Sequence, residues 1–472
     1  MIDNKKQSGF YLLSDNTDAF VARFALAAMS KKTLDIQYYI MHNDASGEYL
    51  AYAILSAADR GVHVRLLVDD IDLGGRDSSL KMLGQHENIQ IRIFNPLVNR
   101  DWLRTFELLI NHDRAGRRMH NKVFIADSAS AIIGGRNIGD EYFDNRENLN
   151  FVDLDILIAG PIITDISNSF DMFWNSRWAT PVENLSKATV IKRQLSRIRT
   201  RLKDRWHHAK NSHYFQNLKR SDLTQKIIDK NIPFIWADAT VFYDPPEKIN
   251  PDTSNRTTHF GMHVTPYIES AKDELQIASS YFIPGRNGEQ WLTKKSRQGI
   301  KIKVLTNSLS TTDVIAVHAG YKKYRTNLIR SGITLFELKS TAQTLRSKAT
   351  RLIKGSSTSS LHAKYMVIDR RYVLISSANF DPRSNVLNTE IGIMINSKTL
   401  AEQTSVLFDR ATSAESSYQL AFDKTNTDKT EKIIWRTEEK GREIYFSKEP
   451  KASWRKKIGV FLIGLLPIEH LL

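Results

Sequence analysis

The chain contains no cysteine, which excludes disulfides, thiolate metal sites and cysteine nucleophiles. It also lacks an apolar run long enough to span a bilayer, and residues 1–10 lack the apolar core of a secretory signal. Acidic residues are fewer than basic ones, 52 against 67, which leaves a formal net charge of +15. This excess favours polyanionic partners such as nucleic acid, polyphosphate or an anionic membrane face.

What the chain does contain is an internal duplication. Three pairs of segments match in the same order: 34–40 with 275–281, 61–69 with 299–307, and 118–127 with 360–369. In the second pair apolar residues alternate with polar or basic ones and then become continuous, as in a strand that enters a core. A helical stretch precedes each of these strands. The repeated strand–helix–strand order predicts an α/β fold with mixed sheets.

The duplication predicts two similar domains and two further segments. These are residues 1–185 as the first domain, 186–231 as a connecting segment, 232–425 as the second domain and 426–472 as a C-terminal extension. The connecting segment is rich in Lys and Arg. This composition fits either a solvated helix that covers a sheet edge or a surface for anionic headgroups.

The C-terminal extension combines basic and apolar residues. Trp454 and the basic residues 455–457 precede an apolar run at 458–468, which is too short to span a bilayer. The pattern fits either an interfacial membrane segment or a terminal helix docked on the protein core.

Both halves carry the motif His-x-Lys-xxxx-Asp. Its members are His120, Lys122, Asp127, His362, Lys364 and Asp369. In an extended strand, positions i and i+2 share a face, so each His and Lys should project toward one site while each Asp falls at the strand end. A neighbouring ammonium opposes a metal dication but suits a phosphate anion, with imidazole as the nucleophile and ammonium countering the oxyanion charge. The doubled motif therefore predicts phosphoryl chemistry.

The motif and the segments after it, Gly134-Gly-Arg-Asn137 and Ser376-Ser-Ala-Asn379, resemble the phospholipase D superfamily. The resemblance covers nearly the whole chain and implies a pseudo-twofold pair of α/β sandwich domains, with both motifs in one site at their interface. It implies no metal and no cofactor. Ser376 stands where glycine is common and Ala378 where the first half has Arg136, departures that concern the shape of the second phosphate loop.

The resemblance also implies roles for individual residues. His120 would attack the phosphodiester and His362 would act as acid and base, although the near-equivalence of the motifs leaves this order open. The groups that would bind the non-bridging phosphate oxygens are Lys122, Lys364, Asn137 and Asn379.

Four acidic residues complete the predicted site. Each catalytic histidine needs its other ring nitrogen oriented, usually by a carboxylate, and the family places this acid on the strand after the Asn. Asp155 and Glu390 are the matching candidates. Asp127 and Asp369 are motif members that would brace the site rather than carry protons.

Segments outside the motif resemble bacterial cardiolipin synthases, in particular the cardiolipin synthase C-like branch. They are Ser8–Leu13, Leu34–Tyr39, Gly134–Phe143, Asp313–Tyr321, Leu387–Glu390 and Leu466–Glu469. The resemblance implies a phosphohistidine ping-pong transfer from phosphatidylglycerol or phosphatidylethanolamine to phosphatidylglycerol, giving cardiolipin. The alternatives are a hydrolytic phospholipase D, a nuclease of the same superfamily, and a non-enzymatic membrane-binding protein that keeps the fold.

The expected partners are phospholipid substrates and an anionic membrane surface. Nucleic acid is not expected, because the apolar C-terminal run has no role on DNA. We expect a peripheral protein at the bacterial inner membrane, with no signal peptide or spanning helix in this chain. Members of the branch often carry more sequence before the equivalent of Ser8, so whether an anchor precedes it is left open. One chain supplies both half-sites, so a monomer should suffice. The membrane face, the preferred donor and an accessory protein are left open.

Overall fold

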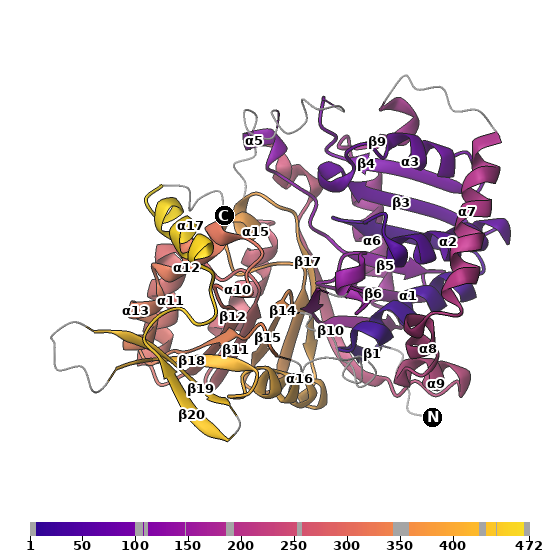
Figure 1. The fold of residues 1–472 in the computed structure, drawn as a ribbon. Coiled ribbons are helices and arrows are strands. Elements are labelled where there is room, and N and C mark those ends of the chain that lie inside the picture. The colour runs from indigo at the N-terminus through magenta and orange to yellow at the C-terminus, as the bar shows by residue number, and fades with distance from the viewer. Residues whose placement is uncertain are drawn as a thin grey trace.

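The computed structural model describes residues 6–99, 107, 112–146, 148–185, 193–252, 257–342, 358–423, 431–439 and 441–466. Residues 186–192 of the predicted connecting segment and 467–472 of the predicted C-terminal extension lie outside this part. The described residues form two mixed sheets with helices packed on their faces (Figure 1). The predicted α/β fold is confirmed.

The sheet of the first half has the strand order β9–β4–β3–β2–β5–β6–β8–β1. The strands are β1 (Ser8–Leu13), β2 (Thr33–Tyr38), β3 (His63–Asp69), β4 (Ile89–Phe94), β5 (Val123–Ala126), β6 (Ser130–Gly134), β8 (Asp155–Ala159) and β9 (Ala179–Pro181). Strands β2, β3 and β4 run parallel, and β5 pairs antiparallel with β2. The strand that carries the first motif therefore lies in the middle of the sheet.

The second sheet repeats this order as β18–β13–β12–β11–β15–β16–β17–β10. Its strands are β10 (Ile235–Tyr243), β11 (Glu274–Ser279), β12 (Lys301–Asn307), β13 (Thr334–Leu338), β15 (Lys364–Ile368), β16 (Tyr372–Ser376), β17 (Ile391–Asn396) and β18 (Ser417–Phe422). A hairpin of β19 (Ile433–Glu439) and β20 (Arg442–Phe446) continues the sheet from β18. This part of the predicted C-terminal extension thus belongs structurally to the second sheet.

Two strand pairings join the halves. Residues Ser8–Phe10 of β1 pair antiparallel with Ile235–Ala237 of β10, so the two sheets share a hydrogen-bonded boundary. Nearer the motifs, β7 (Leu149–Val152) pairs in parallel with β14 (Thr358–Leu361). Because β14 directly precedes His362, this short ladder fixes the second motif against the first half.

Helices cover both faces of each sheet. In the first half they are α1 (Asn16–Met29), α2 (Ala45–Asp59), α3 (Asp77–Leu83), α5 (His112–Ala115) and α6 (Ile163–Trp174), with the 3-10 turns η1 (Asp70–Asp72), η2 (Asp140–Tyr142) and η3 (Val182–Asn184). The connecting segment contributes α7 (Arg193–Ala209), α8 (His213–Lys219) and α9 (Asp222–Ile228). The second half has η4 (Pro246–Ile249), α10 (Phe260–Glu269), α11 (Gly285–Arg297), α12 (Ile315–Lys322), α13 (Arg325–Arg330), α15 (Pro382–Val386), α16 (Lys398–Ala411) and α17 (Trp454–Gly464).

The buried apolar side chains of the described residues form one cluster that takes residues from both halves, one further cluster in each half, and a small fourth cluster where α17 meets α12. Phe170 of α6 and Phe408 of α16 belong to the cluster that both halves share. The further cluster of the first half includes α1 and α2, and that of the second half includes α10 to α13. The shared central core holds the two motifs in one rigid setting.

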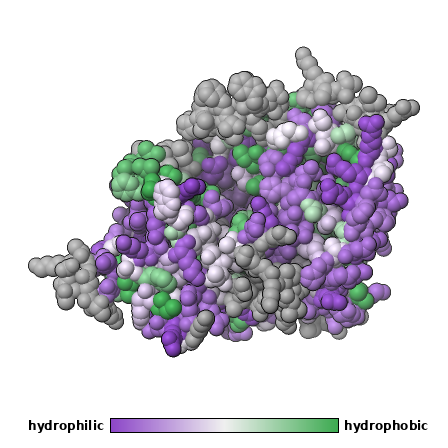
Figure 2. All heavy atoms as spheres, viewed as in Figure 1, coloured by the Kyte–Doolittle hydropathy of each residue, from purple (hydrophilic) through white to green (hydrophobic). Residues whose placement is uncertain are grey.

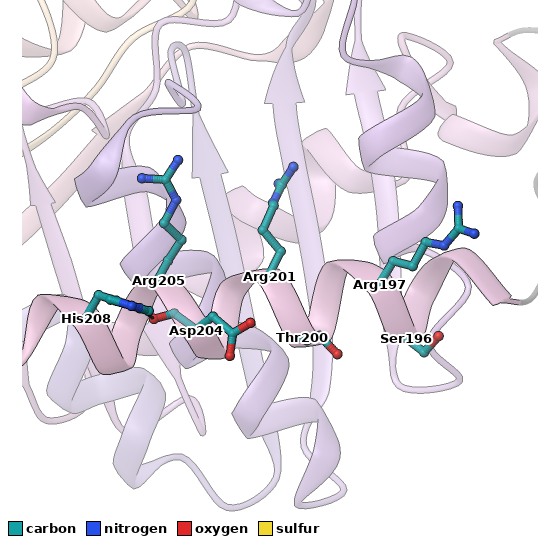
Figure 3. A pocket seen from close by; sticks show the side chains of 7 residues that line it. All are labelled: Ser196, Arg197, Thr200, Arg201, Asp204, Arg205 and His208. Atoms are coloured by element: carbon teal, nitrogen blue, oxygen red, sulfur yellow. Dashed lines mark hydrogen bonds between the residues drawn. The ribbon is translucent and has the colours of Figure 1, made fainter.

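Helix α7 accounts for much of the basic connecting segment. Ile198, Leu202 and Trp206 recur every four residues and are buried, which gives the helix one apolar face. Arg205 projects from another face in Figure 3 and lies 3.3 Å from a carboxylate oxygen of Glu48 in α2. The helix packs on α2 and α3, so it covers helices rather than the sheet edge of our first alternative.

Helix α17 packs on α12 at the other end of the molecule in Figure 1. No helix within the described ranges combines the length and apolar character needed to cross a bilayer.

Candidate active site

The two motifs meet where the halves join. The backbone N–H of His120 donates to the carbonyl of Thr389 (2.9 Å), and the N–H of His362 donates to the carbonyl of Val152 (2.8 Å). Both acceptors come from the opposite half. Each histidine is therefore fixed by the backbone of the other domain, shortly before β5 or β15.

The carboxylates that orient the histidines are also exchanged between the halves. His120 Nδ1 lies 2.9 Å from Oε2 of Glu390, and His362 Nδ1 lies 2.6 Å from Oδ2 of Asp153. Both carboxylates are fully or almost fully buried. With Nδ1 occupied by a carboxylate, the remaining ring nitrogen Nε2 is the atom available for chemistry in each case.

The structure corrects the prediction for Asp155. This carboxylate does not contact a catalytic histidine. It accepts a hydrogen bond from Nη2 of Arg23 (2.8 Å) and lies 3.3 Å from Nη1 of Arg136. The prediction aligned Asp155 with Glu390, because an Ile follows each of them. In the two sheets Asp155 instead matches Gly392, so the counterpart of Glu390 is Asp153, two residues earlier. Asp155 instead stabilises the first domain as part of a buried ion cluster.

The glycines after the first motif explain this arrangement. A Cβ atom at Gly134 would lie 2.0 Å from Asp155 Oδ1, and one at Gly135 would lie 2.2 Å from Asp153 Oδ1. In the second half, a Cβ atom at Gly392 would lie 2.6 Å from Cβ of Ser376. In the first half a glycine, Gly134, faces Asp155, whereas in the second half Ser376 faces a glycine, Gly392. This exchange accounts for Ser376, which departs from the family pattern.

The two motif lysines are buried beside the histidines. Lys122 Nζ donates to the carbonyl of His120 at 2.5 Å, and Lys364 Nζ donates to the carbonyl of His362 and to Oγ of Ser280, at 2.9 Å in the latter case. Burial lowers the pKa of both lysines, to about 7 for Lys122. An anionic phosphate would reverse this effect, because a negative charge favours the ammonium form.

Burial also disfavours the charged form of both imidazoles. It lowers the pKa of His120 to about 4 and lowers the pKa of His362 below its ordinary value. Burial opposes ionisation of Glu390 and Asp153, but the contacts of Glu390 with His120 lower its pKa to about 2, and contact with His362 lowers the pKa of Asp153. A neutral imidazole bound at Nδ1 by a carboxylate is the form in which Nε2 can attack phosphorus.

The two asparagines of the predicted site are held by protein groups. Oδ1 of Asn137 accepts from the N–H of Ile40 (3.2 Å), and its Nδ2 lies 3.0 Å from the hydroxyl of Tyr142. Oδ1 of Asn379 accepts from Ser280 Oγ (2.8 Å), the same hydroxyl that Lys364 contacts. Phosphate binding by these amides remains a prediction.

Asp127 and Asp369 lie outside the site. Asp127 accepts from the backbone N–H groups of residues 31–33 at 2.7–3.1 Å, and Asp369 accepts from those of residues 272–274 at 2.8–2.9 Å. Both therefore bind the turn that leads into β2 or β11, at the end of the motif strand far from the histidine. This position fits the predicted bracing role and places neither carboxylate at a catalytic histidine.

Several site residues were not predicted. The ring centroid of Tyr39 lies 4.9 Å from that of His120, and those of Tyr142 and Phe151 each lie 5.1 Å from that of His362. Aromatic walls of this kind hold the imidazole planes and reduce access of water. The sequence marks none of them, because an isolated aromatic residue after a strand is more often part of the core.

Comparison with known proteins agrees with this geometry. A family model described as "Cardiolipin synthase, PLD-like domain" matches residues 25–174 and 264–412, one copy in each half. The chain belongs to this family. Its similarity to cardiolipin synthase C of Escherichia coli K12 reaches 38% identity over 99% of the chain and 96% of that protein. Cardiolipin synthase A of Pseudomonas entomophila is 25% identical over 85% of the chain and 68% of that protein.

A solved structure supports the fold of this chain. Phosphatidylserine synthase of Haemophilus influenzae Rd KW20 aligns over 99% of this chain and 98% of its own, with a TM-score of 0.60 and 12% identity. The pseudo-twofold phospholipase D fold predicted from the sequence is thereby confirmed, and the chain is an enzyme of the phosphatidyl-transferring type.

Proposed function

We propose that the enzyme synthesises cardiolipin by phosphatidyl transfer through a phosphohistidine. The observation that carries the proposal is the crossed pair of histidine–carboxylate contacts, His120 with Glu390 and His362 with Asp153, each beside a buried lysine. Two imidazoles with matched orientation provide one nucleophile and one proton carrier, as a double displacement at phosphorus requires. Similarity over almost the full length of a cardiolipin synthase supports the choice of substrate class.

The first half-reaction breaks the bond between phosphorus and the headgroup oxygen of the donor lipid. Nε2 of His120 forms a bond to phosphorus, and the leaving alkoxide takes a proton from Nε2 of His362, which enters this step as the imidazolium paired at Nδ1 with Asp153. Lys122 and Lys364 stabilise the charge on the non-bridging oxygens. In the second half-reaction, a hydroxyl of phosphatidylglycerol gives its proton to His362 and its oxygen attacks phosphorus, which releases His120.

We assign the nucleophile to His120 and the acid and base to His362, as the resemblance to the family implies. Burial lowers the pKa of both imidazoles. Single-turnover measurements on variants of each histidine test the assignment.

Phosphatidylglycerol and phosphatidylethanolamine are the proposed donors, with release of glycerol or ethanolamine. The test is to incubate the full chain with phosphatidylglycerol vesicles, with and without phosphatidylethanolamine, and to resolve the lipid products by mass. We expect cardiolipin, and none from His120→Ala. Phosphatidic acid as the sole product would instead establish a hydrolytic phospholipase D.

We further propose a peripheral enzyme of the bacterial inner membrane that acts as a monomer on an anionic surface. The +15 charge supports such a surface, and one chain supplies both histidines and both carboxylates. Nucleic acid is not proposed as a partner; cleavage of plasmid DNA by the pure protein, lost in His120→Ala, would favour the nuclease alternative. Cardiolipin formation by the pure protein would show that no accessory protein is required.

A further inference from the structure

Helix α17 has two apolar faces, of which the protein covers only one. On the covered face, Val460 is 5% exposed and packs with Leu309 and with Ala319 of α12. Lys456 anchors the same side, since its Nζ donates to the carbonyls of Ser310 (3.1 Å) and Thr312 (2.8 Å). The helix is therefore docked on the second domain, as one of our two alternatives predicted.

The opposite face of α17 is an exposed apolar stripe. Its members are Trp454, Ile458, Phe461, Leu462, Leu465 and Leu466. They recur at intervals of three or four residues, which places them on one side of a helix. Each is at least half exposed, and Phe461 and Leu465 reach 68% and 70%. Figure 2 shows the resulting hydrophobic patch beside mainly hydrophilic residues.

The basic residues of α17 lie at the end of the helix where positive charge is unfavourable. Its first turn carries Arg455, Lys456 and Lys457 and no acidic residue. Cations at a helix N-terminus oppose the helix dipole, so local stability would favour acids there. Arg455 and Lys457 are exposed, and the guanidinium of Arg455 lies 5.6 Å from the ring of Trp454. Basic groups and a tryptophan beside an apolar stripe match the headgroup and acyl layers of an anionic bilayer.

The loop that α17 contacts leads to the active site. The loop that α17 holds through Lys456 continues into Asp313, whose carboxylate accepts from the hydroxyl of Tyr281 at 2.9 Å. At its other end, this loop follows Asn307, whose Nδ2 donates to the carbonyl of Leu361 (2.8 Å), the residue before His362. A short covalent and hydrogen-bonded path thus connects α17 with the second motif.

We propose that the exposed stripe of α17 inserts into the interface of an anionic phospholipid bilayer and holds the active site at the lipid surface. The proposal rests in part on the proposed function, because a phosphatidyl donor and acceptor both reside in that surface. Arg455 and Lys457 would contact lipid phosphates while Phe461 and Leu465 enter the acyl boundary.

The test measures binding of the full chain to sedimented vesicles of phosphatidylglycerol and phosphatidylcholine, independently of turnover. Removing an exposed apolar side chain should weaken partitioning by about tenfold, so the double variant F461S/L465S should bind roughly a hundredfold less. The matched control M29S/I228S removes side chains that are 64% and 65% exposed on the first domain and on α9, and it should bind like the wild type. Equal losses in both variants would overturn the proposal.

A second pair of variants separates α17 from α7 as the basic contact surface. R455A/K457A should lose binding to phosphatidylglycerol vesicles, whereas K203A/K210A, which removes exposed lysines at α7, should not. The helices lie at opposite sides of the molecule in Figure 1, so loss only in K203A/K210A would contradict the proposal. Wild-type dimers that F461S/L465S converts to monomers without vesicles would assign the stripe to a second copy instead.

Turnover distinguishes failure at the membrane from failure of the chemistry. With short-chain phosphatidylglycerol dissolved as monomers, F461S/L465S should form product at the wild-type rate, because the site itself is unchanged. On vesicles its rate should fall in parallel with binding. Absence of turnover from the wild type with either substrate would reject the proposed function while leaving the binding result valid.

Discussion

The two halves share a strand order but differ in the groups that surround their motifs. Tyr39 and Ser280 occupy matching positions after β2 and β11. The ring centroid of Tyr39 lies 5.5 Å from Nζ of Lys122, whereas Oγ of Ser280 accepts a hydrogen bond from Lys364. Glu390 also accepts a hydrogen bond from the hydroxyl of Ser377, whereas the first half has Gly135 at the matching position. The two equal sets of reactive groups therefore have unequal surroundings.

The largest difference between the halves lies behind the asparagine loops. The guanidinium of Arg136 is buried and donates to the side chain of Asn16 at 2.8 Å and to the carbonyl of Asp153 at 2.7 Å. Ala378 stands at the matching position and lines a cavity of about 490 Å³ between the second sheet, α10 and α11. A departure that looks small in sequence thus exchanges a buried ion network for an open apolar space.

The largest expected effect comes from removing each histidine in turn. His120→Ala should lose at least about 10⁴-fold in kcat with any substrate, because no phosphoenzyme can form. His362→Ala should lose as much with phosphatidylglycerol but recover with a phosphatidyl ester of a nitrophenol, whose leaving group needs no proton. The measurement is release of nitrophenol in a single turnover. Recovery in His120→Ala instead would reverse the assignment.

Asp153 and Asp155 should respond differently to the same change. Asp153→Asn should lower kcat by about 10²- to 10⁴-fold with little change in the melting temperature, since it orients His362. Asp155→Asn should retain kcat in the folded fraction but destabilise the protein by about 3 kcal/mol, because it leaves Arg23 and Arg136 buried without their carboxylate. Urea unfolding and activity of the same samples test both, and loss of kcat in Asp155→Asn alone would restore our sequence-based choice.

Arg136 and Ala378 sharpen the comparison through stability. Arg136→Ala should cost about 3 kcal/mol, because it leaves the oxygens of Asn16, Leu13 and Asp153 without this donor. Ala378→Leu points into the second-half cavity and should change the free energy of unfolding by less than about 1 kcal/mol. Similar losses in both variants would show that the second half is packed as tightly as the first.

An effect on stability of similar size concerns pH. The pKa of His120 is about 4 in the folded enzyme and 6.5 without burial, so the unfolded chain binds more protons between these values. Stability should therefore be fully present above pH 6.5 and fall by up to about 3 kcal/mol as the pH drops to 4. His120→Gln should show a shallower decrease over this window in urea unfolding. An unchanged slope would mean that folding does not shift the pKa of His120.

The motif itself was predictable because it depends on local geometry. The period of two in an extended strand requires His120 and Lys122, or His362 and Lys364, to share a face, and repetition of the motif identified the chemistry. The basic segment at α7 and the apolar run at α17 were recognised from composition, but their surroundings were not. The orientation of both segments depends on which helices they meet, α2 for one and α12 for the other.

By itself, the sequence determined the duplication, the α/β class and the four reactive side chains, since these follow from residue order and strand periodicity. Tertiary structure decided which carboxylate meets which histidine. Asp153 and Asp155 are equivalent in local pattern, and only the space beside Gly134 and Gly135, together with the guanidinium of Arg136, separates them. That space depends on contacts more than a hundred residues apart, and the partner of each histidine lies in the opposite half of the chain.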